Sequence, residues 1–216
     1  MSKKLHLEIL DAKRQKIFSD LHQIFSDKYY LAGGTALALQ IGHRESLDFD
    51  LFCNQPVSFA QKSKLIQGLR GYNIQTLVDT GDELSIALDK SIKITLLNYF
   101  WDPMFSLVRR PKTIPLLSVK DIATTKAYAL GRRGNYRDYF DLYVIINGQL
   151  AKLPDIIRWC KKKYGDIFSE RMFLEQLVYL GDVAPDRNLR FLAEKYVSPQ
   201  VMEKFFSALV DKQAKR

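Results

Sequence analysis

The stretch that most constrains this chain runs from Tyr29 to Phe52 and reads YYLAGGTALALQIGHRESLDFDLF. Apolar and aromatic residues come first, then a glycine pair, a short segment with helical character, and an alternating polar and apolar run. This pattern predicts a strand over 29–32, a turn at Gly33-Gly34, a helix opened by Thr35, and a second strand over 47–52. The fold must therefore place a glycine turn between a strand and a helix.

The glycine turn is a candidate phosphate site. Two adjacent glycines can adopt backbone angles closed to other residues, and they let the backbone approach a phosphate closely. The N–H groups at the start of the following helix can face the anion. Gly33, Gly34 and Thr35 are therefore predicted to hold a phosphate chain. The alternative is a tight turn that binds nothing.

Two acids follow on the second predicted strand. Asp48 and Asp50 are two residues apart, so both carboxylates would project from one face of a strand. Two hard oxygen ligands suit Mg²⁺, with Mn²⁺ as an alternative, because Mg²⁺ takes one or two carboxylates and completes its shell with water and substrate phosphates. Asp48 and Asp50 are thus predicted as metal ligands and catalytic residues. The alternative is a pair of surface acids near a strand end.

Three residues before these acids are weaker candidates. Arg44 could contact a phosphate, and Ser46 shares the strand face of Asp48 by parity. Both are candidates for binding the same phosphate chain, although Ser46 could equally serve to orient the loop. His43 is interpreted as a structural histidine rather than a base.

A second constellation lies in the helical part of the chain. Lys126 stands in a largely apolar stretch, where a lysine with a function would reach a nucleotide phosphate as a point charge. Asp138 and Asp141 are three residues apart and would share a helix face, and Arg137 could pair with Asp141. The alternative for this set is a salt-bridged helix junction.

Basic residues are concentrated between Arg109 and Arg137. This window holds eight basic residues and one acid, within a chain of net charge +9. Such a cluster is typical of proteins that bind a polyanion, although a solvated basic face without a partner is the alternative. The residues predicted to bind RNA are Arg109, Arg110, Arg132, Arg133 and Arg137.

The order of elements predicts an α+β protein. An α/β lobe (1–112) would hold a mixed sheet with packed helices, and an all-helical lobe (113–216) would follow the proline-bounded segment 109–115. The predicted helices span 8–27, 35–41, 58–69, 119–130, 136–147, 154–164, 169–180, 185–196 and 199–211. The predicted strands span 29–32, 47–52, 74–79, 84–88 and 92–100, the last three as a meander.

The remaining features exclude other classes of protein. No apolar run approaches the roughly 20 residues that span a bilayer, and the N-terminal residues lack the apolar region of a signal peptide. Cys53 and Cys160 lie far apart, which argues against a disulfide framework or a zinc site. A cytoplasmic protein without a membrane partner is expected.

The motifs together resemble a known family. Residues 31–52 are similar to the first motif of the AbiEii/AbiGii toxin nucleotidyltransferases, within the DNA polymerase β-like nucleotidyltransferase superfamily. Residues 121–126 resemble the lysine motif of that family, and 137–143 (RDYFDLY) resemble its last motif. The resemblance implies that the glycine turn and the paired aspartates bind a nucleoside triphosphate and Mg²⁺, that Lys126 contacts phosphates, and that Asp138 supports the site.

The chain departs from the superfamily at one position. The superfamily places a third carboxylate on a later strand, where it deprotonates the attacking hydroxyl, but strand 92–100 offers Thr95 or Asn98. Asp138 or Asp141 could substitute, or the chain could transfer slowly or only bind nucleotide. Asp82 and Asp89 are poorer candidates because they lie in predicted turns.

The resulting hypothesis is a Mg²⁺-dependent nucleotidyltransferase that moves a nucleoside monophosphate to a hydroxyl acceptor. The resemblance implies tRNA or another RNA as the acceptor and a cognate antitoxin as a protein partner, in a toxin–antitoxin or abortive-infection system. The alternatives are transfer to a small hydroxyl compound, as in antibiotic-modifying relatives, and a non-catalytic module that binds nucleotide or RNA.

Overall fold

The computed structural model describes residues 4–25, 28–132, 134–186, 189–192 and 196–214. The chain divides into two compact units, Met1–Ser118 and Val119–Arg216. The predicted α+β class is confirmed, with a sheet in the first unit and helices in the second. None of the helices in the described ranges has the length and apolar character needed to span a bilayer.

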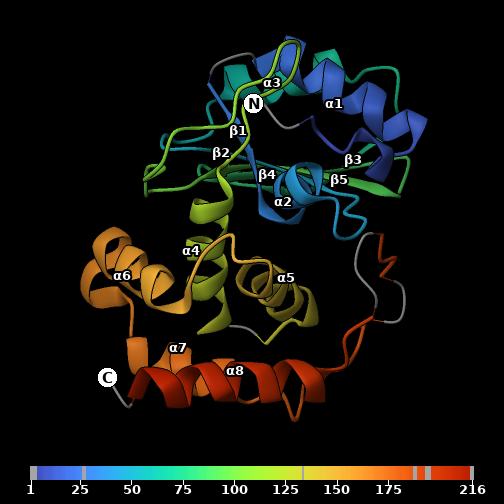
Figure 1. Cartoon of the computed structure of the whole chain (residues 1–216). Coiled ribbons are helices and arrows are strands. Elements are labelled where there is room, and N and C mark those ends of the chain that lie inside the picture. Colours follow the sequence, from blue (N-terminus) through green and yellow to red (C-terminus); the bar gives the residue numbers. More distant parts are fainter. Residues whose placement is uncertain (1–3, 26–27, 133, 187–188, 193–195, 215–216) are drawn as a thin grey trace. The chain divides into compact units, whose positions relative to one another are not determined.

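The first unit is built on a mixed sheet of five strands in the order β1-β2-β5-β4-β3 (Figure 1). β2 pairs with β5 in parallel, and the other neighbouring strands pair antiparallel. The strands are β1 (Tyr30–Ala32), β2 (Phe49–Cys53), β3 (Ile74–Asp79), β4 (Glu83–Leu88) and β5 (Ile92–Asn98). The helical elements of this unit are the 3-10 helix η1 (Leu7–Ile9) and the α-helices α1 (Ala12–Phe25), α2 (Gly33–Ile41) and α3 (Phe59–Gly68).

The two faces of this sheet differ. Figure 1 shows α1 and α3 on one face, and α2 on the opposite side next to β1 and β2. Phe49 and Leu51 are fully buried, and the ring of Phe49 stacks on Phe18 of α1 with centroids 6.4 Å apart. Because side chains alternate along a strand, Asp50 projects from the other face, the side on which α2 begins.

The segment after β5 belongs to the first unit. The amide of Leu31 in β1 donates to the carbonyl of Pro115, and the amide of Leu117 donates to the carbonyl of Leu31, each at 2.8 Å. Leu116 also pairs with Val108. The units therefore divide after Ser118, whereas the sequence analysis places the boundary after residue 112. Backbone pairing with β1 keeps the intervening residues with the sheet.

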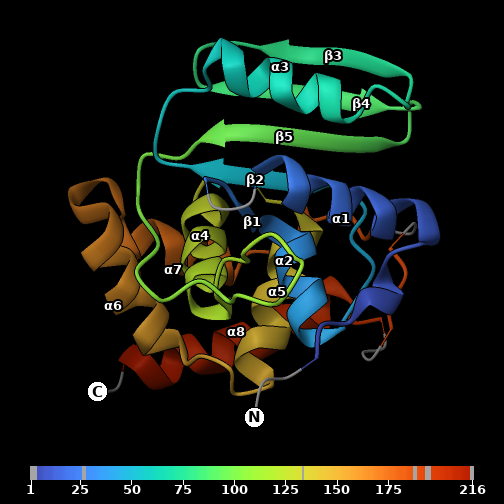
Figure 2. The same cartoon turned by 90° about the horizontal axis from the view of Figure 1, so that it is seen from above.

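The second unit is helical. Its helices are α4 (Val119–Leu130), α5 (Tyr136–Asn147), α6 (Leu153–Tyr164), α7 (Glu170–Leu177) and α8 (Pro199–Ala214), with a 3-10 turn η2 (Gly165–Ile167) after α6. The helix α4 packs on α5, α6 and α7, while α8 packs on α5 and α7. Figure 2 shows the same helices from above.

Two predicted elements need correction. The helix predicted over 185–196 is wrong in the described residues, which are not helical, and residues 187–188 and 193–195 lie outside them. Side chains of α5 hold this segment instead: the hydroxyl of Tyr136 donates to the carbonyl of Val197 at 2.7 Å, and Arg137 pairs with Asp186 at 2.7 Å. Tertiary contacts therefore override the local helical pattern. The predicted first helix also begins later, since α1 starts at Ala12 after η1, and residues 26–27 of its predicted span lie outside the description.

Candidate active site

Gly33 makes room for the carboxylate of Asp50. A Cβ atom added to Gly33 would lie 2.6 Å from Oδ2 of Asp50. The backbone of Gly33 also has a φ angle of +65°, which side-chain-bearing residues rarely adopt. The first glycine is therefore required both by its conformation and by the acid beside it, and the structure brings these two predicted residues together.

Gly34 makes room for Arg44 and Ser46. A Cβ at Gly34 would lie 2.5 Å from Nη2 of Arg44 and 3.1 Å from Oγ of Ser46. Arg44 is only 2% exposed, and its Nη1 donates to the carbonyl of Glu45 at 2.9 Å. A buried guanidinium thus lies next to the first turn of α2. The structure places Arg44 and Ser46 at the glycine turn, in agreement with the region predicted for them.

Thr35 connects the start of α2 to the segment that carries the acids. Its Oγ1 lies 2.9 Å from Oγ of Ser46 and also contacts the carbonyl of Asp48. A carbonyl oxygen only accepts and a hydroxyl has one hydrogen, so Thr35 donates to Asp48 and Ser46 donates to Thr35. These bonds fix the approach of residues 46–48 to the N-terminus of α2.

The first turn of α2 lacks a side-chain cap. Its N-cap residue is Ala32, which has no side-chain acceptor, whereas α3 is capped by Ser58 in a capping box with Gln61. The first N–H groups of a helix need acceptors from outside the helix, and they carry the positive end of its dipole. The start of α2 is therefore suited to an anion.

The structure places Asp48 outside the strand that the sequence predicts for it. It precedes β2, which begins at Phe49, and Leu47 is 41% exposed. The carboxylate of Asp48 accepts from the amide of Lys93 at 3.1 Å, so one of its oxygens is bonded to the backbone at the start of β5. The rule that alternate strand residues share a face does not apply to Asp48, because this residue lies outside the ladder. The predicted strand over 47–52 is therefore two residues too early at its start.

The position opposite Asp50 on β5 is Thr95. Thr95 is in turn directly paired with Ser85 of β4. Oγ of Ser85 lies 3.3 Å from Oγ1 of Thr95 and 2.6 Å from Oε1 of Glu83. The sequence analysis does not identify Ser85 or Glu83. The signal in the sequence is their period-two spacing, which makes them polar residues of one face on a strand that is otherwise apolar.

An aromatic row continues the Asp50 face of the sheet. Phe52 follows Asp50 by two residues, and its ring stacks on Tyr99 with centroids 4.9 Å apart and an interplanar angle of 22°. Tyr99 contacts Trp101 at 5.4 Å, and Trp101 contacts Phe100 at 6.3 Å. Phe100 is 63% exposed. We call Phe52, Tyr99, Phe100 and Trp101 the aromatic row.

The predicted lysine site lies in the second unit. Nζ of Lys126 on α4 lies 2.7 Å from Oδ1 of Asp138 and 2.7 Å from Oδ2 of Asp141, both on α5. All three residues are buried. The structure therefore brings together the predicted helical constellation as a buried ion cluster, but Arg137 pairs with Asp186 and not with Asp141 in the described ion pairs.

The five arginines predicted to bind RNA have different environments. Arg109 is exposed, and Arg110 donates to the carbonyl of Arg109 at 2.8 Å. The guanidinium of Arg132 lies 3.6 Å from the ring centroid of Tyr128, and Arg137 is held by Asp186. Arg133 lies outside the described residues. Arg109 is thus the most accessible candidate of this set in the first unit.

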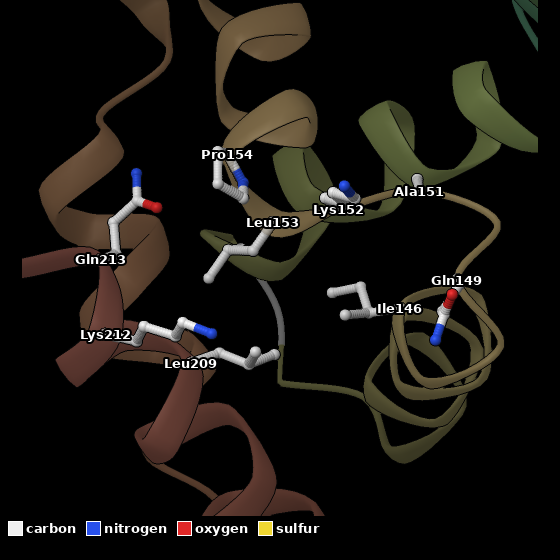
Figure 3. A pocket seen from close by; sticks show the side chains of 9 residues that line it. All are labelled: Ile146, Gln149, Ala151, Lys152, Leu153, Pro154, Leu209, Lys212 and Gln213. Atoms are coloured by element: carbon white, nitrogen blue, oxygen red, sulfur yellow. The ribbon is translucent and has the colours of Figure 1, made fainter. Parts of the chain in front are cut away.

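His43, the neighbour of Arg44 in the chain, is 1% exposed. Figure 3 shows a pocket of about 480 Å³ in the second unit, where Ile146, Leu153 and Leu209 form an apolar wall near Lys212. The nine residues that line this pocket include none of the predicted site residues.

The described part of the chain holds no group of three or more histidine, cysteine, aspartate or glutamate side chains placed to bind a metal ion. Carboxylate oxygens are the ligands that Mg²⁺ prefers, and it commonly binds through one or two of them together with substrate phosphates. The side chains of Asp48, just before β2, and of Asp50, on β2, are of this chemical kind.

Comparison with known proteins identifies the family. Residues 16–86 and 72–209 match the family described as "Nucleotidyl transferase AbiEii toxin, Type IV TA system". The chain is 34% identical over 162 residues to the uncharacterized protein aq_aa25 of Aquifex aeolicus (strain VF5). The aligned region covers 71% of this chain and 74% of that protein.

Solved structures share the fold. JHP933 from Helicobacter pylori has a TM-score of 0.54 and 17% identity, over 95% of this chain and 97% of that one. The nucleotidyltransferase toxin MenT4 (Rv2826c) from Mycobacterium tuberculosis H37Rv has a TM-score of 0.54 and 16% identity, over 93% and 86%. The antibiotic-resistance factor ANT(2'')-Ia has a TM-score of 0.53 and 10% identity, over 71% and 92%.

The family match covers most of the chain, and the glycine turn with its neighbouring aspartate lies within the matched residues. The chain is a nucleotidyltransferase and belongs to the AbiEii toxin family of type IV toxin–antitoxin systems.

Proposed function

We propose that this chain transfers a nucleoside monophosphate from a nucleoside triphosphate to a hydroxyl group of RNA, as the toxin of a toxin–antitoxin system. The observation that carries the proposal is the close approach of Asp50 to Gly33 at the uncapped start of α2. An anion site and a carboxylate are thereby adjacent. This combination suits a triphosphate that is bound together with a cation.

The triphosphate would bind at the N-terminus of α2. The N–H groups of its first turn and the positive end of the helix dipole attract phosphate oxygens. The buried guanidinium of Arg44 next to Gly34 adds positive charge at the same place. Thr35 and Ser46 then serve mainly to hold the acidic segment against this turn, through the bonds described above.

Asp48 and Asp50 are the residues proposed to hold Mg²⁺, or Mn²⁺ in its place. When bound, such an ion neutralises charge on the triphosphate and favours the departure of pyrophosphate. Asp50 is positioned by the glycine turn, and Asp48 by the amide of Lys93 and by the bond from Thr35 to its own carbonyl. The bond from the amide of Lys93 orients the carboxylate of Asp48 before a ligand binds, which lowers the cost of assembling the site.

Lys126 and Asp138 are proposed as the phosphate-binding pair of the second unit. Lys126 would contact a phosphate as a point charge, and Asp138 would hold the ammonium group in position. Two carboxylates lie next to the ammonium group of Lys126, and the residue is only 8% exposed. A substrate phosphate would exchange with one of these carboxylates.

RNA is favoured as the acceptor over a small hydroxyl compound because of the aromatic row. Aromatic rings offer stacking surfaces to unpaired bases, whatever the base. The row begins two residues after Asp50 on the same strand and ends at the exposed ring of Phe100. Arg109, in the segment that follows, adds an exposed positive charge for the phosphate backbone.

The acceptor can be tested directly. The purified chain is incubated with Mg²⁺ and each of the four nucleoside triphosphates labelled at the α-phosphate, with total tRNA in one arm and aminoglycosides in the other. We expect label in the RNA arm alone. Periodate treatment of the RNA, which destroys its terminal diol, should abolish the transfer if the 3′ end is the acceptor.

Asp48→Asn and Asp50→Asn serve as the negative controls in both arms. Label in aminoglycosides but not in RNA would overturn the proposed acceptor, and transfer that persists in both variants would overturn the proposed site. Toxicity is tested by inducing the wild-type chain and Asp50→Asn in a bacterial host. Growth arrest by the wild type alone is expected if transfer causes the toxicity.

A further inference from the structure

A line of polar side chains crosses the sheet at the level of Asp50. Asp50 on β2 is paired with Thr95 on β5, and Thr95 is paired with Ser85 on β4. Directly paired residues project from the same face of a sheet. Thr95 is 7% exposed and Ser85 is fully buried. Buried hydroxyl groups at the centre of a sheet require hydrogen-bond partners, and here they bond to each other.

The line ends in a carboxylate. Oγ of Ser85 lies 2.6 Å from Oε1 of Glu83 and 3.3 Å from Oγ1 of Thr95. A carboxylate only accepts hydrogen bonds, and a hydroxyl group has one hydrogen to donate. Ser85 therefore donates to Glu83, and Thr95 donates to Ser85. The oxygen of Thr95 keeps acceptor capacity, and the residue paired with it on β2 is Asp50.

We propose that Glu83, acting through Ser85 and Thr95, takes up the proton of the attacking hydroxyl group. The proposal rests on the nucleotidyl transfer proposed above. As the acceptor oxygen forms its bond to the α-phosphorus, its proton passes to Oγ1 of Thr95. Thr95 passes its own proton to Ser85, and Ser85 passes its proton to Glu83.

The step is balanced. The bond between the α-phosphorus and the bridging oxygen of the β-phosphate breaks, and its electron pair leaves with pyrophosphate. Glu83 ends the step as a neutral carboxylic acid and returns its proton to solvent before the next turnover. Glu83 does not touch the substrate in this scheme, so it is a positioning residue and proton store that acts through two hydroxyl groups.

The other acids that could serve are engaged differently. Asp138 and Asp141 each lie 2.7 Å from the ammonium of Lys126. Asp82 accepts from Nδ2 of Asn98 at 2.7 Å, and Asp89 pairs with Lys13. Glu83, in contrast, connects by hydrogen bonds to the residue that pairs with Asp50.

Charged groups lie near Glu83 on the hairpin of β3 and β4 and on the neighbouring strand β5. Asp82 precedes it in the chain and Asp79 lies on β3, opposite Leu84, where it pairs with Lys62. Lys93 lies on β5, two residues before Thr95. Any variant at Glu83 is therefore to be compared with the wild type at the same ionic strength.

The test measures single-turnover transfer to RNA across a range of pH, together with nucleotide affinity and thermal unfolding. The central variant is Glu83→Gln, which keeps an oxygen that accepts from Ser85 but cannot take up a proton. Ser85→Ala and Thr95→Val interrupt the line at its two hydroxyl groups. Thr76→Val on the edge strand β3 and Glu175→Gln on α7, both at exposed positions, are the matched controls.

We expect Glu83→Gln to slow transfer by about 10²-fold to 10³-fold, as for loss of a general base, and to remove the rise of the rate with pH on its acidic side. Nucleotide affinity and unfolding temperature should stay close to the wild type. Ser85→Ala and Thr95→Val should show the same loss, and combining either with Glu83→Gln should add little, because the three residues act as one unit.

If Glu83→Gln transfers label at the wild-type rate and with the wild-type pH profile, the proposal is wrong. The proposal is also wrong if Glu83→Gln loses transfer activity while Ser85→Ala and Thr95→Val keep it. It is likewise wrong if the loss of activity in Glu83→Gln is explained by a fall in its unfolding temperature alone. If the wild type itself transfers no label to any acceptor, the proposed nucleotidyl transfer is at fault, and the proton path fails with it. If the wild type is active and Glu83→Gln equals it, only the proton path is wrong.

Discussion

Gly33 and Asp50 are in such close proximity that a methyl group on the glycine would lie 2.6 Å from a carboxylate oxygen of the aspartate. The relationship explains why a glycine stands at this position more fully than its backbone angle does. The turn at Gly33 leaves room for the carboxylate of Asp50, which therefore lies at the start of α2. The proposed phosphate binding and the placement of the carboxylate are thus coupled through one residue.

Gly33→Ala should therefore abolish transfer while leaving the fold in place. The added methyl group displaces Asp50, and its strained φ angle adds a cost of about 1–2 kcal/mol to folding. We expect a loss of transfer of at least about 10²-fold, since small misplacements of reacting groups have effects of this size. Single-turnover kinetics and thermal unfolding measure the two effects separately.

Gly81→Ala is the matched control, because a Cβ at Gly81 would meet no atom within 4 Å. It should retain wild-type transfer. Equal activity in Gly33→Ala and Gly81→Ala would contradict the role given to the glycine turn.

Thr35→Val should weaken nucleotide binding without unfolding the chain. The substitution removes the hydroxyl that bonds to Ser46 and to the carbonyl of Asp48, and it leaves a part-buried carbonyl without this donor. We expect a cost of about 1–3 kcal/mol in stability and a lower affinity for the nucleotide with Mg²⁺. Isothermal titration calorimetry measures the affinity.

Thr125→Val on α4 is the control for Thr35→Val, since its hydroxyl only bonds back to the carbonyl of Ile122 in the same helix. Its nucleotide affinity should equal that of the wild type. The account fails at this point if both variants bind the nucleotide equally well.

Lys126→Met should strongly destabilise the helical unit. It leaves Asp138 and Asp141 buried without the ammonium that both carboxylates contact at 2.7 Å. Removing one partner of a buried ion pair typically costs about 3–5 kcal/mol. Urea unfolding followed by circular dichroism measures the change.

Arg171→Met tests the same chemistry at the surface, where Arg171 pairs with Glu175 and both side chains are largely exposed. Exposed pairs contribute about 0–1 kcal/mol, so this variant should unfold almost like the wild type. A similar small effect for Lys126→Met would show that the buried cluster does not stabilise the unit.

Phe100→Ala should weaken RNA binding and leave nucleotide binding unchanged. Loss of one stacking ring costs about 1–3 kcal/mol per base, which corresponds to a rise in the KM for RNA. Phe59→Ala is the control, because Phe59 is 85% exposed but lies on α3, on the opposite face of the sheet (Figure 1). An equal effect of both variants on the KM for RNA would argue against the aromatic row as the RNA site.

Both cysteines should resist thiol reagents in the native protein. Cys53 is 4% exposed and Cys160 is fully buried, and burial raises the pKa of the Cys160 thiol. Little thiolate is therefore available for reaction at neutral pH. Titration with an aromatic disulfide reagent should show slow reaction in buffer and two rapid equivalents in guanidinium chloride. Rapid reaction of Cys160 in buffer would contradict its burial.

Local patterns in the sequence predict the strands, most of the helices and the α+β class correctly. The meander over 74–100 follows from alternation of apolar residues, and α4 and α5 follow from helical periodicity bounded by glycines. These elements are specified by residues close together in the chain. The helix predicted over 185–196 fails for the opposite reason, since contacts with α5 determine that segment.

The candidate site is only partly predictable for the same reason. The glycine turn and Asp50 are neighbours in one short unit, so their proximity follows from the sequence. Ser85 pairs with Thr95 across the hairpin of β4 and β5, but the pairing of Thr95 with Asp50 depends on the register between β5 and β2, which are far apart in the chain. Nothing local fixes the register of β5 with β2, and the connection of Glu83 to Asp50 therefore escapes detection until the sheet is assembled.

The central claim is that Asp50 at the glycine turn supports transfer of a nucleoside monophosphate. The most direct measurement compares nucleoside triphosphates labelled at the α-phosphate with those labelled at the γ-phosphate, in the presence of RNA and Mg²⁺. The account predicts that the α label enters RNA, that the γ label is released as pyrophosphate, and that Asp50→Asn or removal of Mg²⁺ with a chelator stops both. Entry of the γ label into RNA, or undiminished transfer by Asp50→Asn, would contradict it.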